Sequence, residues 1–238
     1  MAGQTTADYV VLSGGEMSNI EIIQGDCLEI MKTFADNQFD LVLTDPPYGK
    51  GQNIVAVGEC PAYKDDYSWN DAPPKQEYFD ELIRVSKNQI VWGGNYFSCL
   101  WKDDCRGFLV WDKCQCSNNH ADCEMAWTSY DRNAKLFQYC FSGNRFGFPS
   151  QIQGVGAKSN RVHPTQKPKE LMIWCLKQAG DVETVLDPFA GSGTTGVACE
   201  ALGIDCTLIE INEKYYQDCQ KRVQEEKDKM GLFNGLNQ

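Results

Sequence analysis

The sequence lacks the features that mark a membrane or secreted protein. None of its apolar runs approaches the roughly 18 uninterrupted residues that a membrane-spanning helix needs. Residues 1–19 contain no cationic segment followed by an apolar one, so no secretory signal is predicted. We therefore expect no contact with a membrane and a cytoplasmic location.

Metal-binding patterns are also scarce. The chain has only two histidines, and none of its twelve cysteines forms a Cys-x₂-Cys pair. The strongest cluster of potential ligands comprises Cys105, Cys114, Cys116, His120 and Cys123. Its spacing fits no common zinc site, so we predict no metal. Without a secretory signal, the cysteines are read as reduced thiols.

Positive charge is in short supply overall but is concentrated in one stretch. The net charge is −11, which by itself argues against a nucleic-acid partner. Yet seven of the 22 basic residues lie in residues 132–169, which contain no Asp or Glu. A cationic stretch on an acidic body is typical of a surface that contacts phosphates. The seven are Arg132, Lys135, Arg145, Lys158, Arg161, Lys167 and Lys169.

Length and pattern predict one α/β domain. The 238 residues, 42% of them hydrophobic, suit a single domain spanning 1–238. Strands are expected at 20–23, 39–44, 89–92, 108–111, 125–129, 184–186 and 205–209. Helices are expected at 27–34, 74–86, 168–179, 194–202 and 212–229. Alternation of the two predicts a doubly wound, mainly parallel Rossmann-like sheet. Residues 49–69 read as a long loop, and 132–162 as an inserted variable segment.

A glycine-rich loop links the predicted strand at 184–186 to the helix at 194–202. Gly191, Gly193 and Gly196 fit the dinucleotide pattern G-x-G-x-x-G, and Glu210 follows Gly191 by 19 residues, at a strand end. A carboxylate at that spacing suits the hydroxyls of a ribose. Two cofactors, NAD and S-adenosylmethionine, therefore compete for the loop. Asp187 would repel the pyrophosphate of NAD but attract the ammonium of S-adenosylmethionine, which has no phosphate.

Two further positions bear on the same cofactor. Phe189 is expected to pack against it. Asp26 follows the first strand and could accept a hydrogen bond from an adenine amino group, or it could simply cap the helix that starts at residue 27.

The sequence Asp45-Pro46-Pro47-Tyr48 ends the buried strand at 39–44. It presents a carboxylate, carbonyls of stiff proline backbone and an aromatic ring at the carboxyl edge of the sheet, where α/β folds bind ligands. Acceptors beside a ring suit the amino group of a flat, stacked base. The simpler interpretation is a Pro-Pro turn that ends a strand.

Together these residues resemble the DNA methyltransferases that modify amino groups, either N6 of adenine or N4 of cytosine. Asp45-Pro46-Pro47-Tyr48 resembles their catalytic motif, and the segment from Asp187 to Gly193 resembles their cofactor motif. The segment from His163 to Pro168 resembles a further family element beside the methionine moiety. The catalytic motif comes first, with the variable segment between the two, which is the permuted order of the family's β group.

The resemblance implies a function and a set of roles. It implies methyl transfer from S-adenosylmethionine to a flipped base in double-stranded DNA, with Asp45, Pro46, Pro47 and Tyr48 as catalytic residues. Asp in the first position of this motif usually accompanies adenine in the family. The implied cofactor residues are Asp26, Lys167, Asp187, Phe189, Ala190, Gly191, Ser192, Gly193, Thr194 and Glu210.

The resemblance also bears on how the protein contacts DNA and on its biological setting. The implied phosphate contacts are Lys135, Arg145, Lys158 and Arg161. The resemblance also points to a restriction-modification setting in a bacterial or phage-infected cell. Alternatives that stay open are N4-cytosine methylation and, from another class, an NAD-dependent oxidoreductase. The sequence allows a homodimer as well as a monomer.

Overall fold

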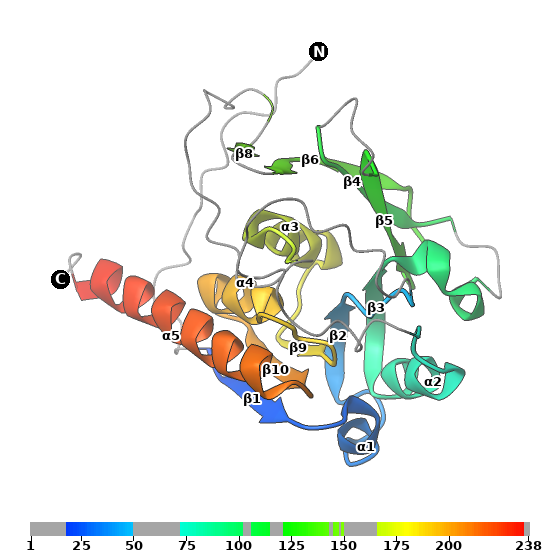
Figure 1. Cartoon of the computed structure of the whole chain (residues 1–238), viewed down its shortest axis with the longest axis horizontal. Coiled ribbons are helices and arrows are strands. Elements are labelled where there is room, and N and C mark those ends of the chain that lie inside the picture. Colours follow the sequence, from blue (N-terminus) through cyan, green and yellow to red (C-terminus); the bar gives the residue numbers. More distant parts are fainter. Residues whose placement is uncertain are drawn as a thin grey trace.

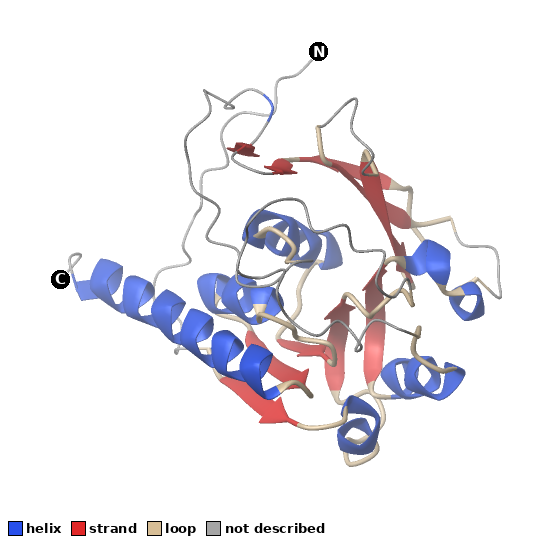
Figure 2. Cartoon of the chain, viewed as in Figure 1, coloured by secondary structure: helices blue, strands red, loops and turns tan. Residues whose placement is uncertain are grey.

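The computed structural model describes residues 18–49, 72–101, 106–114, 121–142, 145–147, 149 and 166–235. Within these residues the chain forms a mixed α/β fold around an eight-stranded sheet with the order β1-β10-β9-β2-β3-β5-β4-β6 (Figures 1 and 2). The prediction of a doubly wound, mainly parallel sheet is confirmed.

The sheet has a parallel half and a half that contains a reversed strand. The parallel half consists of β1 (Ile20–Gln24), β10 (Asp205–Glu210), β9 (Thr184–Asp187), β2 (Phe39–Thr44) and β3 (Ser86–Trp92). The other half begins with β5 (Cys123–Thr128), which is antiparallel to β3 and to β4 (Phe108–Asp112). The edge strand β6 (Lys135–Gln138) runs parallel to β4. A separate pair joins β7 (Cys140–Ser142) and β8 (Arg145–Gly147).

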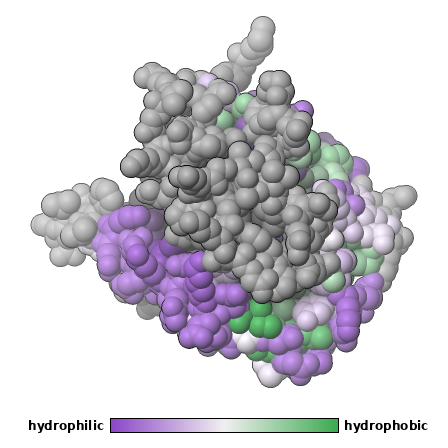
Figure 3. Space-filling model, viewed as in Figure 1, coloured by the Kyte–Doolittle hydropathy of each residue, from purple (hydrophilic) through white to green (hydrophobic). Residues whose placement is uncertain are grey.

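Helices cover both faces of the sheet. One face packs against α3 (Lys169–Ala179), α4 (Thr194–Leu202) and α5 (Glu213–Gly235), and the other against α1 (Cys27–Met31) and α2 (Gln76–Arg84). Two short 3₁₀ turns, η4 (Gly94–Tyr96) and η5 (Ser98–Leu100), follow β3. The visible surface of α5 is largely hydrophilic (Figure 3), as expected for a helix that buries one stripe only.

Strand β2 shows why the fold has two cores. Leu41 and Leu43 are fully buried beneath α3 and α4, while Val42 points into the α1–α2 side. Successive side chains of a strand alternate between faces, so a strand covered on both sides must be apolar throughout. That is why 39–44 reads as a continuous apolar run.

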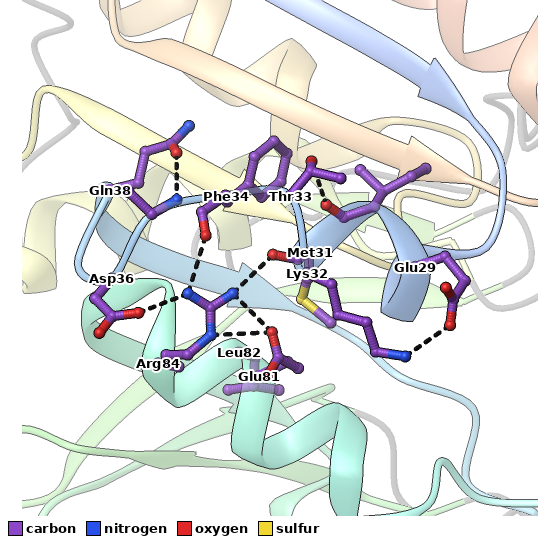
Figure 4. A network of polar contacts seen from close by, with 12 residues as sticks. Glu29, Met31, Lys32, Thr33, Phe34, Asp36, Gln38, Glu81, Leu82 and Arg84 are labelled. Carbon is purple, nitrogen blue, oxygen red and sulfur yellow. Dashed lines mark hydrogen bonds and ion pairs between the residues drawn. The ribbon is translucent and has the colours of Figure 1, made fainter.

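The α1–α2 side is tied together by Arg84 (Figure 4). Its guanidinium donates to the carbonyls of Phe34 and Met31 at 2.9 Å each, and pairs with Asp36 and Glu81. Helix α1 stops at Met31, whose carbonyl also accepts from the amide of Phe34 at 3.0 Å. Arg84 adds side-chain donors to the carbonyls of Met31 and Phe34 and thereby fixes the turn between α1 and β2.

Several predicted boundaries differ from the observed ones: β3 begins at Ser86 and not at residue 89, and α5 ends at Gly235 and not at residue 229. The helix predicted at 27–34 ends at Met31, and the chain continues in short turns in which the amides of Thr33 and Phe34 donate to the carbonyls of Ile30 and Met31. The segment 132–162 was predicted as an insertion, but its first part forms β6 of the central sheet. Weak periodicity hid β6, β7 and β8. The predicted loop 49–69 lies almost wholly outside the described residues. No described helix has the length and apolarity needed to span a bilayer.

Candidate active site

A cavity of about 190 Å³ lies where β1, β2, β9 and β10 end. Four carboxylates line it: Asp26 follows β1, Asp45 follows β2, and Asp187 and Glu210 are the last residues of β9 and β10. Parallel strands bring their carboxyl ends to one edge, so residues far apart in sequence meet there. Nine of the ten predicted cofactor residues line this cavity, and their contacts with a cofactor stay a prediction.

Gly193 is the predicted cofactor residue that does not line the cavity. It precedes α4 with φ of 75°, and a Cβ placed there would collide with the sulfur of Cys219 on α5. Glycine is required at this point both for the backbone conformation and for the close approach of α5. Its role in the structure is to let the loop turn tightly over the cavity.

Arg222 of α5 holds the same loop from behind. Its guanidinium donates to the hydroxyls of Ser192 at 2.8 Å and Thr194 at 3.2 Å, and to the carbonyl of Ser192. Burial lowers the pKa of Arg222 from its ordinary value. Sequence reasoning missed this residue, because Arg222 reads as one more charge on a polar helix.

Glu210 is positioned by the backbone around it. One carboxylate oxygen accepts from the amide of Gly191 and the other from the amide of Asn212, at 2.8 Å each. Burial raises the pKa of Glu210 to about 7, although these two amides oppose the shift. Each oxygen keeps further acceptor capacity, so the carboxylate can still receive a hydroxyl from a ligand.

Asp187 is held by neutral donors as well. It accepts from the hydroxyls of Thr44 at 2.7 Å and Thr195 at 2.6 Å, and from the amide of Phe189 at 3.1 Å. Burial raises the pKa of Asp187 to about 6 against these donors. The side chain thus links β2, β9 and α4, a structural role that sequence reasoning did not foresee. The predicted attraction of a ligand ammonium stays a prediction.

Asp26 turns out to cap a helix and to line the cavity. Its carboxylate accepts from the amide of Leu28 at 2.8 Å, at the start of α1. Both interpretations of this residue were open, and the capping interpretation is confirmed. Next to it, Tyr78 of α2 packs against Phe189 with ring centroids 6.0 Å apart. These two rings form an apolar wall of the cavity.

The Asp-Pro-Pro-Tyr segment bends so that Asp45 and Pro47 face the cavity, while Pro46 is buried. The hydroxyl of Tyr48 donates to one oxygen of Asp45 at 2.5 Å. The other oxygen of Asp45 pairs with the ammonium of Lys167. Both oxygens of the predicted catalytic carboxylate therefore have a donor from the chain itself.

Tyr48 lies on a small aromatic platform. Its ring stacks on Tyr96 with centroids 4.8 Å apart and an interplanar angle of 26°, and contacts Phe97 edge-on. Gly93 sits directly beneath the ring, where a Cβ would overlap with Tyr48. Gly93, the first residue after β3, is thus needed to seat the tyrosine. Tyr96, on which the ring stacks, is exposed at 42%.

Lys167 joins the catalytic segment to the reversed half of the sheet. Its buried ammonium also lies 3.0 Å from Glu124 of β5, and Glu124 in turn pairs with Lys113 at the end of β4. The result is a chain of alternating charges: Lys113, Glu124, Lys167 and Asp45. Sequence reasoning missed Lys113 and Glu124; the only clue was a single Glu within an otherwise apolar strand.

The charges in this chain support one another. Burial alone would raise the pKa of Glu124, but Lys167 and Lys113 lower it to about 2. Burial opposes the charge of Lys167, yet Asp45 and Glu124 raise its pKa above the ordinary value. Burial raises the pKa of Asp45 while Lys167 opposes that shift. Buried charges of this kind are maintained only as partners.

The structure divides the predicted cationic stretch into two groups. Three of its seven residues are used within the fold: Arg132 stacks on Tyr130, Lys167 pairs with Asp45, and Lys169 pairs with Glu226. The other four are the predicted phosphate contacts. Lys135 is exposed on the edge strand β6, whereas the side chains of Arg145, Lys158 and Arg161 lie outside the described residues.

Within the described part of the chain, no three His, Cys, Asp or Glu side chains are grouped as a metal site would require. Cys114 and Cys123 of the predicted cluster form no disulfide, and Cys105, Cys116 and His120 lie outside the described residues.

Comparison with known proteins adds a family to this geometry. The sequence profile of a DNA methylase family matches residues 110–221. The Escherichia coli (strain K12) protein YubD, which carries a methylase name, is 31% identical over 220 residues, covering 84% of this chain and 88% of that protein. The type II methyltransferase M.HpaI of Haemophilus parainfluenzae is 27% identical over 255 residues, covering 91% and 76%.

Solved structures show the same fold. The M1.HpyAVI–SAM complex superposes with a TM-score of 0.53 at 22% identity and covers 85% of this chain and 99% of that one. The cytosine-N4-specific PvuII DNA methyltransferase gives a TM-score of 0.56 at 16% identity, with coverage of 89% and 91%.

Proposed function

The chain belongs to the family of DNA methyltransferases that modify the N6 amino group of adenine or the N4 amino group of cytosine, and we propose that it modifies adenine N6 in double-stranded DNA. Enzymes of this family take the methyl group from S-adenosylmethionine. An oxidoreductase that uses NAD is therefore set aside. We further propose that the enzyme acts in the cytoplasm of a bacterial or phage-infected cell, as a modification enzyme like its type II relatives.

The observation that carries the proposal is the shared cavity. Asp45 and Pro47 of the catalytic segment line the same space as Asp187, Phe189 and Glu210 of the cofactor loop. A methyl donor bound at the loop and a base held by Asp45 would therefore meet in one cavity. Proximity of this kind supplies a large part of the rate of a group-transfer reaction.

The cavity fits the proposed cofactor in its donors and acceptors. Glu210 has acceptor capacity for ribose hydroxyls, and Tyr78 and Phe189 offer an apolar wall for a flat adenine ring. A pyrophosphate would meet four carboxylates, whereas the methionine part of S-adenosylmethionine brings an ammonium. Bound there, the cofactor would supply an electrophilic methyl group.

Asp45 would act on the target amino group. The nitrogen of an adenine amino group is conjugated with the ring and is a poor nucleophile. Asp45 would accept one N–H and the carbonyl of Pro46 the other, which draws the lone pair out of conjugation without prior loss of a proton. Tyr48 would stack on the base, for which aromatic stacking contributes about 1–3 kcal/mol.

The base must leave the duplex to reach this cavity, at a cost of a few kcal/mol. Lys135 on the edge strand β6 lies at the side of the sheet from which the cationic stretch continues. We propose that Lys135, Arg145, Lys158 and Arg161 neutralise phosphates there. Phosphate contacts position the protein on the duplex and do not read its sequence.

Mass spectrometry of nucleosides tests the proposal. Unmethylated DNA is incubated with the enzyme and S-adenosylmethionine, digested and separated. N6-methyladenine is the expected product, because the motif begins with Asp, which usually accompanies adenine in this family. N4-methylcytosine as the main product would refute the choice of base but not the family.

A further inference from the structure

The catalytic carboxylate is closed off by its own protein. One oxygen of Asp45 receives the hydroxyl of Tyr48 at 2.5 Å, and the other receives the ammonium of Lys167. A target amino group has to displace one of these donors before it can bind to Asp45. The structure must therefore offer the displaced donor another partner, since a buried ammonium without a counter-charge is costly.

Glu124 has the position and the spare acceptor for this. Its Oε2 lies 3.0 Å from the Lys167 ammonium, and the contact is not aligned as a hydrogen bond. Among the described residues no other group donates a hydrogen bond to this buried oxygen. Small changes in the outer torsions of Lys167, or in the plane of the Glu124 carboxyl group, would align it. The ammonium already touches both carboxylates, so it need not travel to change partners.

We propose that Glu124 is a positioning residue for methyl transfer, which takes over the Lys167 ammonium when the target amino group occupies Asp45. The inference rests on the proposed function. Lys113 is part of the same device, because it pairs with the other oxygen of Glu124 and limits how strongly Glu124 attracts Lys167. The charges of the four side chains cancel before and after the exchange, so the buried site never carries a net charge.

Two neutral variants of similar size make opposite predictions. Glu124→Gln leaves Lys167 with Asp45 as its charged partner, so the base must break a stronger pair. Its single-turnover rate should fall by about tenfold or more, which is the contribution of one charged hydrogen bond. Lys113→Gln releases Glu124 to Lys167, so its rate should exceed that of the wild type. If the four charged side chains only stabilised the fold, both variants would lower the rate.

The pH profile separates the two roles again. Asp45 must be ionised to accept the amino proton, and the neighbouring charge of Glu124 makes this ionisation harder. In Glu124→Gln the acid limb of the rate should therefore move to lower pH while the maximum rate falls. The titratable groups that act on Asp45 in the described structure are Lys167, Glu124 and Tyr48, and Asp187 at the end of β9 interacts with it across the cavity. Misfolding would lower the rate without moving the limb.

A spectroscopic readout that does not depend on turnover completes the test. Buried lysine ammonium groups exchange slowly enough for NMR with ¹⁵N-labelled lysine, and Lys167→Arg assigns the signal. The added ligands are a short unmodified duplex that contains the sequence the enzyme methylates and the non-reactive cofactor analogue sinefungin. Together they should shift the Lys167 signal in the wild type. The shift should be absent from Glu124→Gln.

The outcomes are distinct. A Glu124→Gln rate within twofold of wild type, or equal loss in both variants with an unmoved acid limb, would overturn the inference. A wild-type chain that methylates cytosine N4 would refute the adenine proposal but leave the inference intact, because Asp45 would bind an amino group in either case. A chain that transfers no methyl group to DNA would overturn both.

Discussion

Two pairs of carboxylates lie in or next to the cavity, and the fold holds them differently. Asp187 and Glu210, in the parallel half of the sheet, accept hydrogen bonds from hydroxyls and amides. Asp45 and Glu124, where the reversed half begins, are paired with the ammonium groups of Lys167 and Lys113. Neutral donors fix a carboxylate in place and leave its charge for a ligand. A paired ammonium cancels the charge and must shift its contact before a ligand can bind.

Removing the charge of Asp45 should separate the two carboxylate pairs most clearly, because it should affect methyl transfer and not cofactor binding. Asp45→Asn keeps the shape of the side chain but loses the charge that draws the amino lone pair out of conjugation. Methyl transfer should fall on the order of a thousandfold, within the range that a positioned acid or base contributes. Cofactor affinity should stay within threefold, because Glu210 and the loop are untouched. Incorporation of tritiated methyl groups and calorimetry measure the two quantities.

Asp36→Asn is the matched control, since Asp36 is exposed and pairs with Arg84 on the far side of α1. It should leave both quantities unchanged. More than a tenth of wild-type activity in Asp45→Asn would remove Asp45 from the catalytic role.

Removing the shared ammonium tests the other half of the comparison. Lys167→Met leaves Asp45 and Glu124 as buried carboxylates with Lys113 as their remaining cation, so unfolding free energy should fall by about 3–5 kcal/mol at pH 7. Lys169→Met breaks the pair with Glu226, which keeps Lys229 as a second partner, and leaves the site alone, so it should cost clearly less than Lys167→Met. Urea unfolding of both variants gives the difference.

The cost of Lys167→Met should shrink as pH falls. Without the ammonium, the pKa values of the two carboxylates in the folded state rise above those of the unfolded chain. A raised pKa favours the folded state below the unfolded value and loses that benefit as pH rises, so the variant regains stability on acidification. Equal costs at pH 5 and pH 7 would show that the lost stability is not electrostatic.

The half of the site built by parallel strands could be predicted from sequence. Short sequence patterns identify the Asp-Pro-Pro-Tyr motif after a strand, the glycine loop and the acid 19 residues after Gly191. The parallel sheet then brings these segments together at the carboxyl ends of its strands. The charge chain could not be predicted. Lys167 and Asp45 are 122 residues apart, and Glu124 and Lys113 meet only through the register of β4 and β5. Register depends on packing across the sheet, which no local pattern fixes.

The ribose acceptor should have a smaller effect, and on binding rather than transfer. Glu210→Ala removes an acceptor already positioned by the amides of Gly191 and Asn212, so affinity for S-adenosylmethionine should fall more than tenfold, in line with about 1.5–3 kcal/mol for a charged hydrogen bond. The control is Glu213→Ala, exposed in the first turn of α5. Unchanged affinity in Glu210→Ala by calorimetry would contradict the assignment.

The smallest effect is a pH dependence that only the neutral-donor pair should show. Burial raises the pKa of Glu210 to about 7, so its ionised fraction falls as pH drops from 8 to 6. A protonated carboxyl accepts hydroxyls more weakly, and affinity for S-adenosylmethionine should decline by up to about tenfold for each pH unit below 7.

The cofactor's own amino group titrates near pH 8, so the wild-type profile alone is not decisive. The difference between the profiles of wild type and Glu210→Ala isolates the carboxylate, and two parallel profiles would show that Glu210 is ionised throughout this range. Glu124, whose pKa lies at about 2, stays charged across the same range. In Glu124→Gln, affinity for S-adenosylmethionine should therefore depend on pH as it does in the wild type.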